Sequence, residues 1–250
     1  MFFVAKILLI GYTCYCMFLN QFFNNPILGV LLIVALIMSL TLHEFAHAFI
    51  ALKCGDRTAK INGRVTLNPL KHLDPVGTVM MLTVGFGFAK PVPVNPQNFK
   101  NYKRGMFAVS IAGITVNIIL AVLSSFFAVL SYHLGAHFLV WAFFYLFMQF
   151  NFMFAFFNLI PIFPLDGFRL LETALKERNK FVQFMRKYGQ MIFIFLIVMS
   201  LLANFATRNG LPDWFMFLSP LDLYMDFTAR LLGGSLIRGW ELVFGVRLPL

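Results

Sequence analysis

Long apolar runs joined by basic connections limit this chain to one kind of fold. Five runs are candidates for membrane-crossing helices: residues 2–19, 27–52, 106–132, 138–160 and 191–205. About twenty helical residues cross a hydrocarbon core, and backbone polar groups inside a bilayer must be satisfied within the helix. The chain has 250 residues, of which 60% are hydrophobic and only 12% charged, as in integral membrane proteins. The sequence therefore predicts an all-α polytopic membrane protein with about five to six transmembrane helices.

Lys and Arg residues are concentrated in two connections, and their positions predict the orientation of the chain. Fifteen of the twenty fall within residues 53–104 or 169–187, whereas the turns at 20–26 and 133–137 contain none. Because basic loops stay in the cytoplasm, we expect a multi-pass protein of the cell (inner) membrane with a cytoplasmic N-terminus. The same flanking residues account for the net charge of +10, so no nucleic-acid partner is expected. The oligomeric state stays open.

Three shorter segments are not predicted to be ordinary crossings. Residues 59–67 alternate polar and apolar side chains, which predicts a strand. Residues 75–89 are apolar but have basic loops on both sides, so we expect a re-entrant hairpin, followed by an extended proline-rich stretch at 89–96. Together these form a small membrane-associated β element. In residues 211–250 charged side chains interrupt the apolar runs, and an interfacial helix and a sixth crossing both remain open.

The second apolar run ends in a motif that carries chemistry. His43 and His47 are four residues apart and share one helix face, so both imidazoles can bind one metal ion. Glu44 projects about 100° away from His43, beside the metal, where it can take a proton from metal-bound water. Short His-Glu-x-x-His matches also arise by chance. Ionisable side chains at membrane depth, however, are costly and usually functional.

Asp166 is the best candidate for a third metal ligand. Catalytic zinc usually takes three protein ligands and leaves one position open. Asp166 follows the fourth run, on the side where His43 and His47 end the second, and Pro161 and Pro164 should loosen the helix before it. The alternative role of Asp166 is to cap a turn. Five weaker candidates lie in loops, on a solvated helix or on the opposite side: His72, Asp74, Glu172, His133 and His137.

Two asparagines lie in apolar helices and need hydrogen-bond partners there. Asn158 comes eight residues before Asp166, and Asn117 lies inside the third run. Either amide could brace a neighbouring helix, donate to a developing oxyanion or hold an extended substrate strand. Gly113, one turn before Asn117, is expected to allow close helix packing.

Several motifs follow one another in a fixed order between about residue 40 and residue 170. They are residues 43–47, 63–78 and 88–96, the pair Gly113 and Asn117, and residues 158–167 with Asn158, Pro161, Pro164 and Asp166. In these motifs the chain resembles the site-2 protease family of intramembrane zinc metalloproteases. It resembles the minimal branch without PDZ or CBS domains. Where many relatives have Gly-Pro, this chain has Gly113-Ile114-Thr115, a minor departure.

The resemblance implies a three-helix core that holds one zinc ion per chain through His43, His47 and Asp166. Glu44 would be the general base, and Asn158 would bind substrate or the oxyanion. We expect one integral-membrane domain over residues 1–250, with a catalytic core at about 27–170 and accessory helices at 171–250.

The predicted function is hydrolysis of peptide bonds in membrane-embedded substrates near the cytoplasmic face, with Glu44 activating a zinc-bound water. The expected partners are a membrane-spanning protein or peptide and the lipid bilayer. A strand at 59–67 or 88–96 could hold the unwound substrate by β-augmentation. The alternative is a non-proteolytic membrane zinc-binding protein or transporter. Such a protein would not need Glu44, and a transporter would be expected to show inverted repeats.

Overall fold

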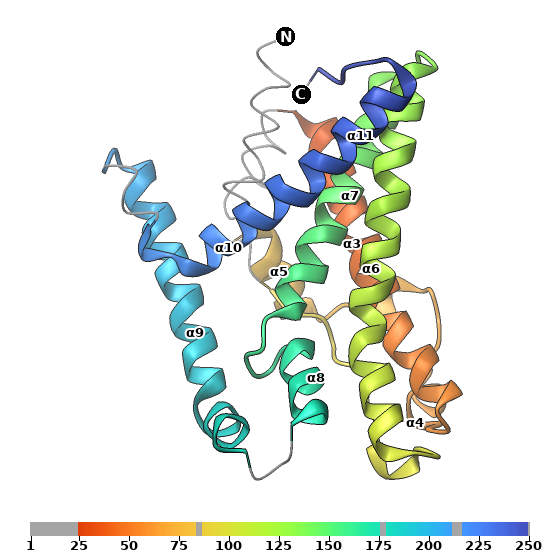
Figure 1. The fold of residues 1–250 in the computed structure, drawn as a ribbon, viewed down its shortest axis with the longest axis vertical. Coiled ribbons are helices and arrows are strands. Elements are labelled where there is room, and N and C mark those ends of the chain that lie inside the picture. Colours follow the sequence, from red (N-terminus) through yellow and green to blue (C-terminus); the bar gives the residue numbers. More distant parts are fainter. Residues whose placement is uncertain (1–24, 84–86, 176–178, 212–216, 250) are drawn as a thin grey trace.

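The computed structural model describes residues 25–83, 87–175, 179–211 and 217–249, which form an assembly of helices (Figure 1). Four of these helices are long and apolar enough to cross a membrane: α3 (Pro26–Lys53), α6 (Tyr102–His133), α7 (Phe138–Leu159) and α9 (Lys180–Arg208). The prediction of a mostly helical fold with several helices able to cross a membrane is confirmed. The predicted first crossing at residues 2–19 lies outside the described residues, so the count of five to six stays a prediction.

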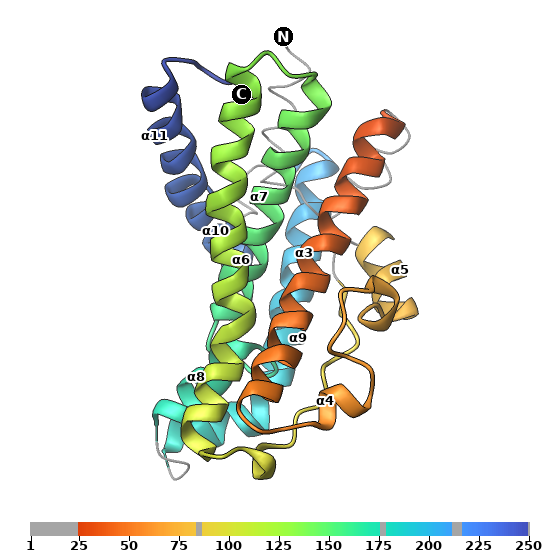
Figure 2. The ribbon, with the colours of Figure 1, turned by 90° about the vertical axis from the view of Figure 1, so that its right-hand side faces the viewer.

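Helices α3, α6 and α7 form the core of the molecule. Figure 2 shows α6 running antiparallel to α3 and packed beside it. The buried face of α6 carries mostly small side chains, which let the neighbouring backbones approach closely: Gly105, Ser110, Ala112, Gly113, Ala121, Ser124, Ser125 and Ala128. Helix α7 is tied to α3 by a buried hydrogen bond, in which Asn151 Nδ2 donates to Ser39 Oγ over 2.9 Å.

The two basic connections lie at the same end of the helix assembly. Helix α4 (Thr58–Ile61), which follows α3, and helix α8 (Asp166–Ala174), which follows α7, both lie at the lower end in Figure 1. The turn between α6 and α7 lies at the upper end. The fold therefore separates the basic connections from this uncharged turn, as the charge pattern predicted.

The strand predicted at residues 59–67 is wrong, because α4 occupies its first part. Asp56 Oδ1 accepts hydrogen bonds from the backbone N–H and the hydroxyl of Thr58, which starts a helical turn. Gly63, at a φ of +64°, then ends that turn in the left-handed conformation. Ile61 is 82% exposed, so the polar and apolar alternation does not reflect a buried strand face.

The rest of the connection between α3 and α6 contains two 3-10 turns, η2 (Pro69–Lys71) and η3 (Pro96–Asn98), and helix α5 (Pro75–Thr83). Among the described residues, β pairing is limited to one antiparallel bridge between Leu73 and Ala89. This bridge brings the two ends of segment 75–89 side by side, as a hairpin requires. The predicted β element is thus reduced to a single bridge, and insertion of the hairpin into the membrane stays a prediction.

The C-terminal region consists of α10 (Pro220–Thr228), the π-helical turn η5 (Ala229–Gly233) and α11 (Gly234–Phe244). Trp240 Nε1 donates to Ser125 Oγ and fixes α11 on α6. Helix α10 contacts both α9 and α7. Ser200 of α9 donates to both Asp222 oxygens, and the Tyr224 hydroxyl donates to the Phe156 carbonyl of α7. Helix α9 is therefore attached to the core partly through its contacts with α10.

Candidate metal centre

Helix α3 places two histidines on its buried face, close to its basic end. His43 and His47 are 5% and 7% exposed, and their Nε2 atoms are 3.0 Å apart. The four-residue spacing of the pair puts one imidazole above the other, as the sequence predicted. Two ring nitrogens at this separation can face one metal ion.

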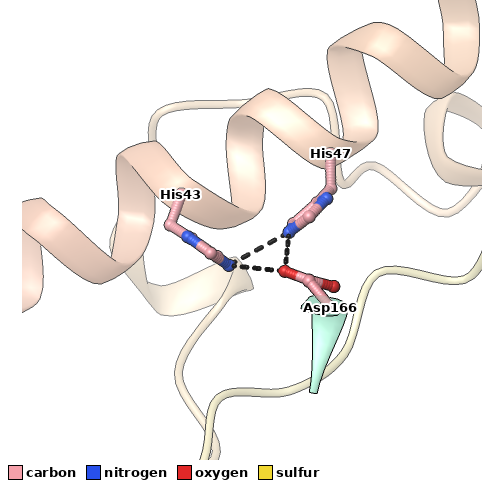
Figure 3. A group of neighbouring side chains, drawn as sticks. All are labelled: His43, His47 and Asp166. Atoms are coloured by element: carbon pink, nitrogen blue, oxygen red, sulfur yellow. Dashed lines mark hydrogen bonds and ion pairs between the residues drawn. The ribbon is translucent and has the colours of Figure 1, made fainter. Parts of the chain in front are cut away.

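Asp166 reaches the same point from the other side (Figure 3). Helix α7 ends at Leu159, the segment with Pro161 and Pro164 is not helical, and Asp166 is the first residue of α8. Its Oδ2 lies 3.3 Å from His43 Nε2 and 3.0 Å from His47 Nε2.

Position 167 requires glycine because the backbone of α8 comes close to the end of α7 there, and not because the chain needs a left-handed turn. A Cβ on Gly167 would lie 2.2 Å from the Leu159 carbonyl oxygen. The absence of a side chain therefore lets the start of α8 fold back against the end of α7.

The three side chains fit a zinc ion. Two imidazole nitrogens and one carboxylate oxygen are a common donor set for zinc, and tetrahedral ligands about 2.0–2.1 Å from the metal lie about 3.3–3.4 Å from one another. The observed separations of 3.0–3.3 Å are close to that value. Burial alone would raise the pKa of Asp166, but the adjacent His47 and His43 side chains hold it well below its usual range.

Helix α6 forms the third wall of the centre. The Val109 carbonyl lies 2.7 Å from His47 Nδ1, which leaves Nε2 of that ring free for the metal. A Cβ on Gly113 would lie 2.4 Å from His43 Cε1 and 2.6 Å from His47 Nε2. Gly113 therefore allows close packing, as predicted, and the packing is against the two imidazoles.

Glu44 lies beside this cluster and is half-buried. Arg64 is an additional charged residue near it, which the sequence reasoning did not single out. Arg64 is 4% exposed, and its guanidinium donates through Nη2 to the Lys90 carbonyl. Burial lowers the pKa of Arg64, and the Glu44 carboxylate counteracts that shift. Arg64 lies in residues 63–78, which resemble the site-2 protease family, and this position could have identified it. The loop contains several other basic residues, so the sequence did not distinguish Arg64 from them.

The two asparagines occupy different environments. Asn158 lies in the last turn of α7 and is half-buried, and its Nδ2 donates to the Phe154 carbonyl. Asn117 is completely buried, and neither atom of its amide has a hydrogen-bond partner. Asn158 is therefore the more accessible of the two.

The weaker ligand candidates lie apart from the centre. His72 Nε2 bonds the Thr66 carbonyl, and Asp74 accepts from Gly77 N at the start of α5. Glu172 pairs with Arg186. His133 ends α6, and His137 caps α7. In the part of the chain that the structure describes, the group able to hold a metal is His43, His47 and Asp166.

A buried His-His-Asp centre in a bundle of apolar helices is the kind of site found in membrane metalloenzymes. Comparison with known proteins identifies the family. The sequence profile of peptidase family M50 matches residues 133–201. The chain is 44% identical to YwhC of Bacillus subtilis over 178 residues, which cover 68% of this chain and 81% of that protein. It is 33% identical to Rip2 of Mycobacterium tuberculosis over 223 residues, which cover 86% of this chain and 82% of that protein.

A more distant relative is MJ0392 of Methanocaldococcus jannaschii, at 27% identity over 72% of this chain and 45% of that protein. All three proteins are named as zinc metalloproteases. No solved structure matches the chain significantly. The chain belongs to peptidase family M50, the site-2 protease family, and it is a zinc metalloprotease of that type.

Proposed function

We propose that this protein cleaves peptide bonds of membrane-embedded proteins near the cytoplasmic face of the membrane. The observation that carries the proposal is the location of the metal centre. His43 and His47 lie on the buried face of an apolar helix near its basic end, and Asp166 joins them from the junction after α7. A substrate helix can approach such a centre through the lipid without leaving the membrane.

The proposed chemistry divides the work among few residues. Zinc held by His43, His47 and Asp166 would acidify water and polarise a carbonyl group. Glu44 accepts the proton of the attacking water and returns it to the leaving amine. Asn158, half-buried at the end of α7, donates a hydrogen bond to the oxyanion or the substrate backbone.

Residues 91–95 are a better candidate than residues 59–67 for holding an extended substrate, because residues 58–61 are helical. Within the described residues, the backbone N–H groups of Val92 and Val94 have no hydrogen-bond partner. They alternate with Pro91 and Pro93, which have no N–H, so only one edge of the segment can donate to a strand. A substrate strand would pair with that edge by β-augmentation.

The proposed setting is the cell (inner) membrane, with the N-terminus and both basic connections in the cytoplasm. The charge distribution and the location of both connections at one end support it. The partners are then a membrane-spanning protein or peptide and the bilayer.

Coexpression with candidate single-pass membrane proteins tests this function, with wild type compared to Glu44→Gln. The substitution removes the base and leaves the three metal ligands, so we expect cleavage to fall by about a hundredfold or more with unchanged zinc content. Equal cleavage by both forms would contradict the mechanism and favour a non-proteolytic zinc protein. Asp166→Ala is the companion variant, because it should lose both zinc and cleavage; undiminished zinc content would remove Asp166 from the site.

A further inference from the structure

Asn117 is a buried amide with no partner at either end. Its side chain is completely buried in α6, and neither Oδ1 nor Nδ2 makes a hydrogen bond within the described structure. Buried side-chain amides are nearly always hydrogen-bonded, so an unpaired one needs an explanation. Its burial also makes direct contact with substrate a poor explanation.

His43 has a matching deficiency. Its Nδ1 atom is buried without a hydrogen-bond partner, whereas Nδ1 of His47 has the Val109 carbonyl at 2.7 Å. An imidazole that binds a metal through Nε2 carries its proton on Nδ1, and that N–H is almost always donated to an oxygen. One histidine of the centre therefore has its outer acceptor in place, and the other lacks one.

The two unpaired groups lie along the same stripe of α6. Val109, Gly113 and Asn117 follow one another at four-residue intervals, so they share the helix face that contacts the histidines. A Cβ on Gly113 would lie 2.6 Å from His43 Nδ1, which puts this ring nitrogen directly against the stripe. Helical side chains lean toward the N-terminus of their helix, so Asn117 leans from the next turn toward Gly113 and the His43 ring.

The antiparallel course of α3 and α6 fits the same pairing (Figure 2). His47 lies nearer the basic end and meets the earlier residue of the stripe, Val109. His43 lies one turn deeper and faces the later part of the stripe, toward Asn117.

We propose that Asn117 is a positioning residue for the metal ligand His43. Its Oδ1 accepts the hydrogen bond of His43 Nδ1–H, directly or through one water, and holds the ring with Nε2 toward Asp166. This role rests on the proposed metal centre and replaces a role of Asn117 in substrate binding.

The test measures zinc affinity of the purified full-length protein by competition with a chelator, using Zn²⁺ alone as the probe. Asn117→Leu keeps the size of the side chain without an acceptor, and Asn117→Asp keeps an acceptor oxygen. We expect Asn117→Leu to bind zinc about 10–100-fold more weakly and Asn117→Asp to stay within about threefold of wild type. If Asn117→Leu does not purify as a folded protein, the isosteric pair Asn117→Val and Asn117→Thr makes the same comparison.

Asn151→Leu is the matched control, because Asn151 is also completely buried but bonds Ser39 and the Phe147 carbonyl. It should leave zinc affinity unchanged. Wild-type affinity in Asn117→Leu, equal losses in Asn117→Leu and Asn151→Leu, or no rescue by Asp would overturn the proposal. Asp166→Ala distinguishes failure of the proposed metal centre from failure of the proposed role of Asn117. If it binds zinc as wild type does, the metal centre itself is wrong; if it fails as expected while Asn117→Leu binds normally, only the role of Asn117 is wrong.

Discussion

Gly113 shows how much the metal centre depends on a single residue without a side chain. A Cβ at this position would come within 2.6 Å of atoms in both imidazoles, closer than real carbon contacts. Gly113→Ala must therefore displace the rings or push α6 away from α3. We expect it to weaken zinc binding by about tenfold or more, measured by chelator competition on the purified protein.

Gly239→Ala provides the matched control for this substitution. Gly239 lies in α11, and a Cβ there would have no atom within 4 Å. Alanine is favoured over glycine in a helix by about 0.5–1 kcal/mol, so this variant should bind zinc normally and unfold at a slightly higher temperature. Normal zinc binding by Gly113→Ala would show that the helices can separate without disturbing the ligands.

At the scale of residues, the sequence predicted the side chains that meet at the centre. His43, His47 and Asp166 could be found because ionisable residues are rare in such an apolar chain and have few alternative partners. The contact of Val109 with His47 could not be predicted, because every residue has a carbonyl and only the packing of α6 selects this one.

At the scale of elements, Asp56 holds the connection between α3 and α6 together. Its carboxylate is completely buried and accepts hydrogen bonds from Asn95 N, Asn98 Nδ2 and both donors of Thr58. These bonds fix the end of the proline-rich segment against the end of α3. The segment proposed to bind substrate thus has a rigid anchor.

We expect Asp56→Asn to destabilise this connection by about 1–3 kcal/mol at pH 7, because an amide cannot accept from all four donors. Limited proteolysis should then cut within residues 91–98 sooner than in wild type. Asp74→Asn is the control, since Asp74 accepts one bond from Gly77 N through its side chain. If wild type and Asp56→Asn resist proteolysis equally, Asp56 does not anchor the proline-rich segment.

The Asp56 carboxylate also predicts that the stability of the fold depends on pH. Burial would raise the pKa of Asp56, but its hydrogen bonds lower it below the ordinary value. The ionised group therefore stabilises the fold above the unfolded-state pKa of about 3.9, and this contribution is lost as pH falls through the lower folded-state pKa. Thermal unfolding of wild type and Asp56→Asn should differ most near neutral pH and converge in acid; a gap that widens in acid would contradict the assignment.

Elements defined by long apolar runs were predicted well, and those set by single polar contacts were not. The run predicted at 138–160 corresponds to α7 at Phe138–Leu159, because hydrophobicity alone defines it. Helix α9 begins at Lys180, well before the predicted 191, because its first turns are polar and Asn179 caps them. The false strand at 59–67 shows that one Asp and one Gly can override an alternating pattern.

At the scale of the whole molecule, the fold separates two kinds of surface. The basic connections gather at one end, and α9 exposes large apolar side chains along its length, as a lipid-facing helix does: Met191, Ile194, Phe195, Val198, Leu202 and Phe205. Both surfaces support the orientation proposed above. The apolar runs predicted its helices, but the way α10 attaches α9 to α7 depends on contacts between distant residues and could not be predicted.

Cysteine labelling tests this orientation, in a variant with Cys14, Cys16 and Cys54 replaced by Ser. Ile61, the last residue of α4, and Leu134, in the turn after α6, are 82% and 71% exposed, and α4 and this turn lie at opposite ends of the helix assembly (Figure 1). A membrane-impermeant maleimide should label Leu134→Cys in spheroplasts and label Ile61→Cys only after lysis. The reverse pattern would invert the proposed topology.

The most direct test of the central claim is the zinc K-edge X-ray absorption spectrum of the purified protein, recorded with its zinc-to-protein ratio. The proposed centre predicts one zinc ion per chain, with two imidazole ligands and oxygen ligands at about 2.0–2.2 Å. A sulfur shell at about 2.3 Å, or fewer than two imidazoles, would contradict a centre built from His43, His47 and Asp166.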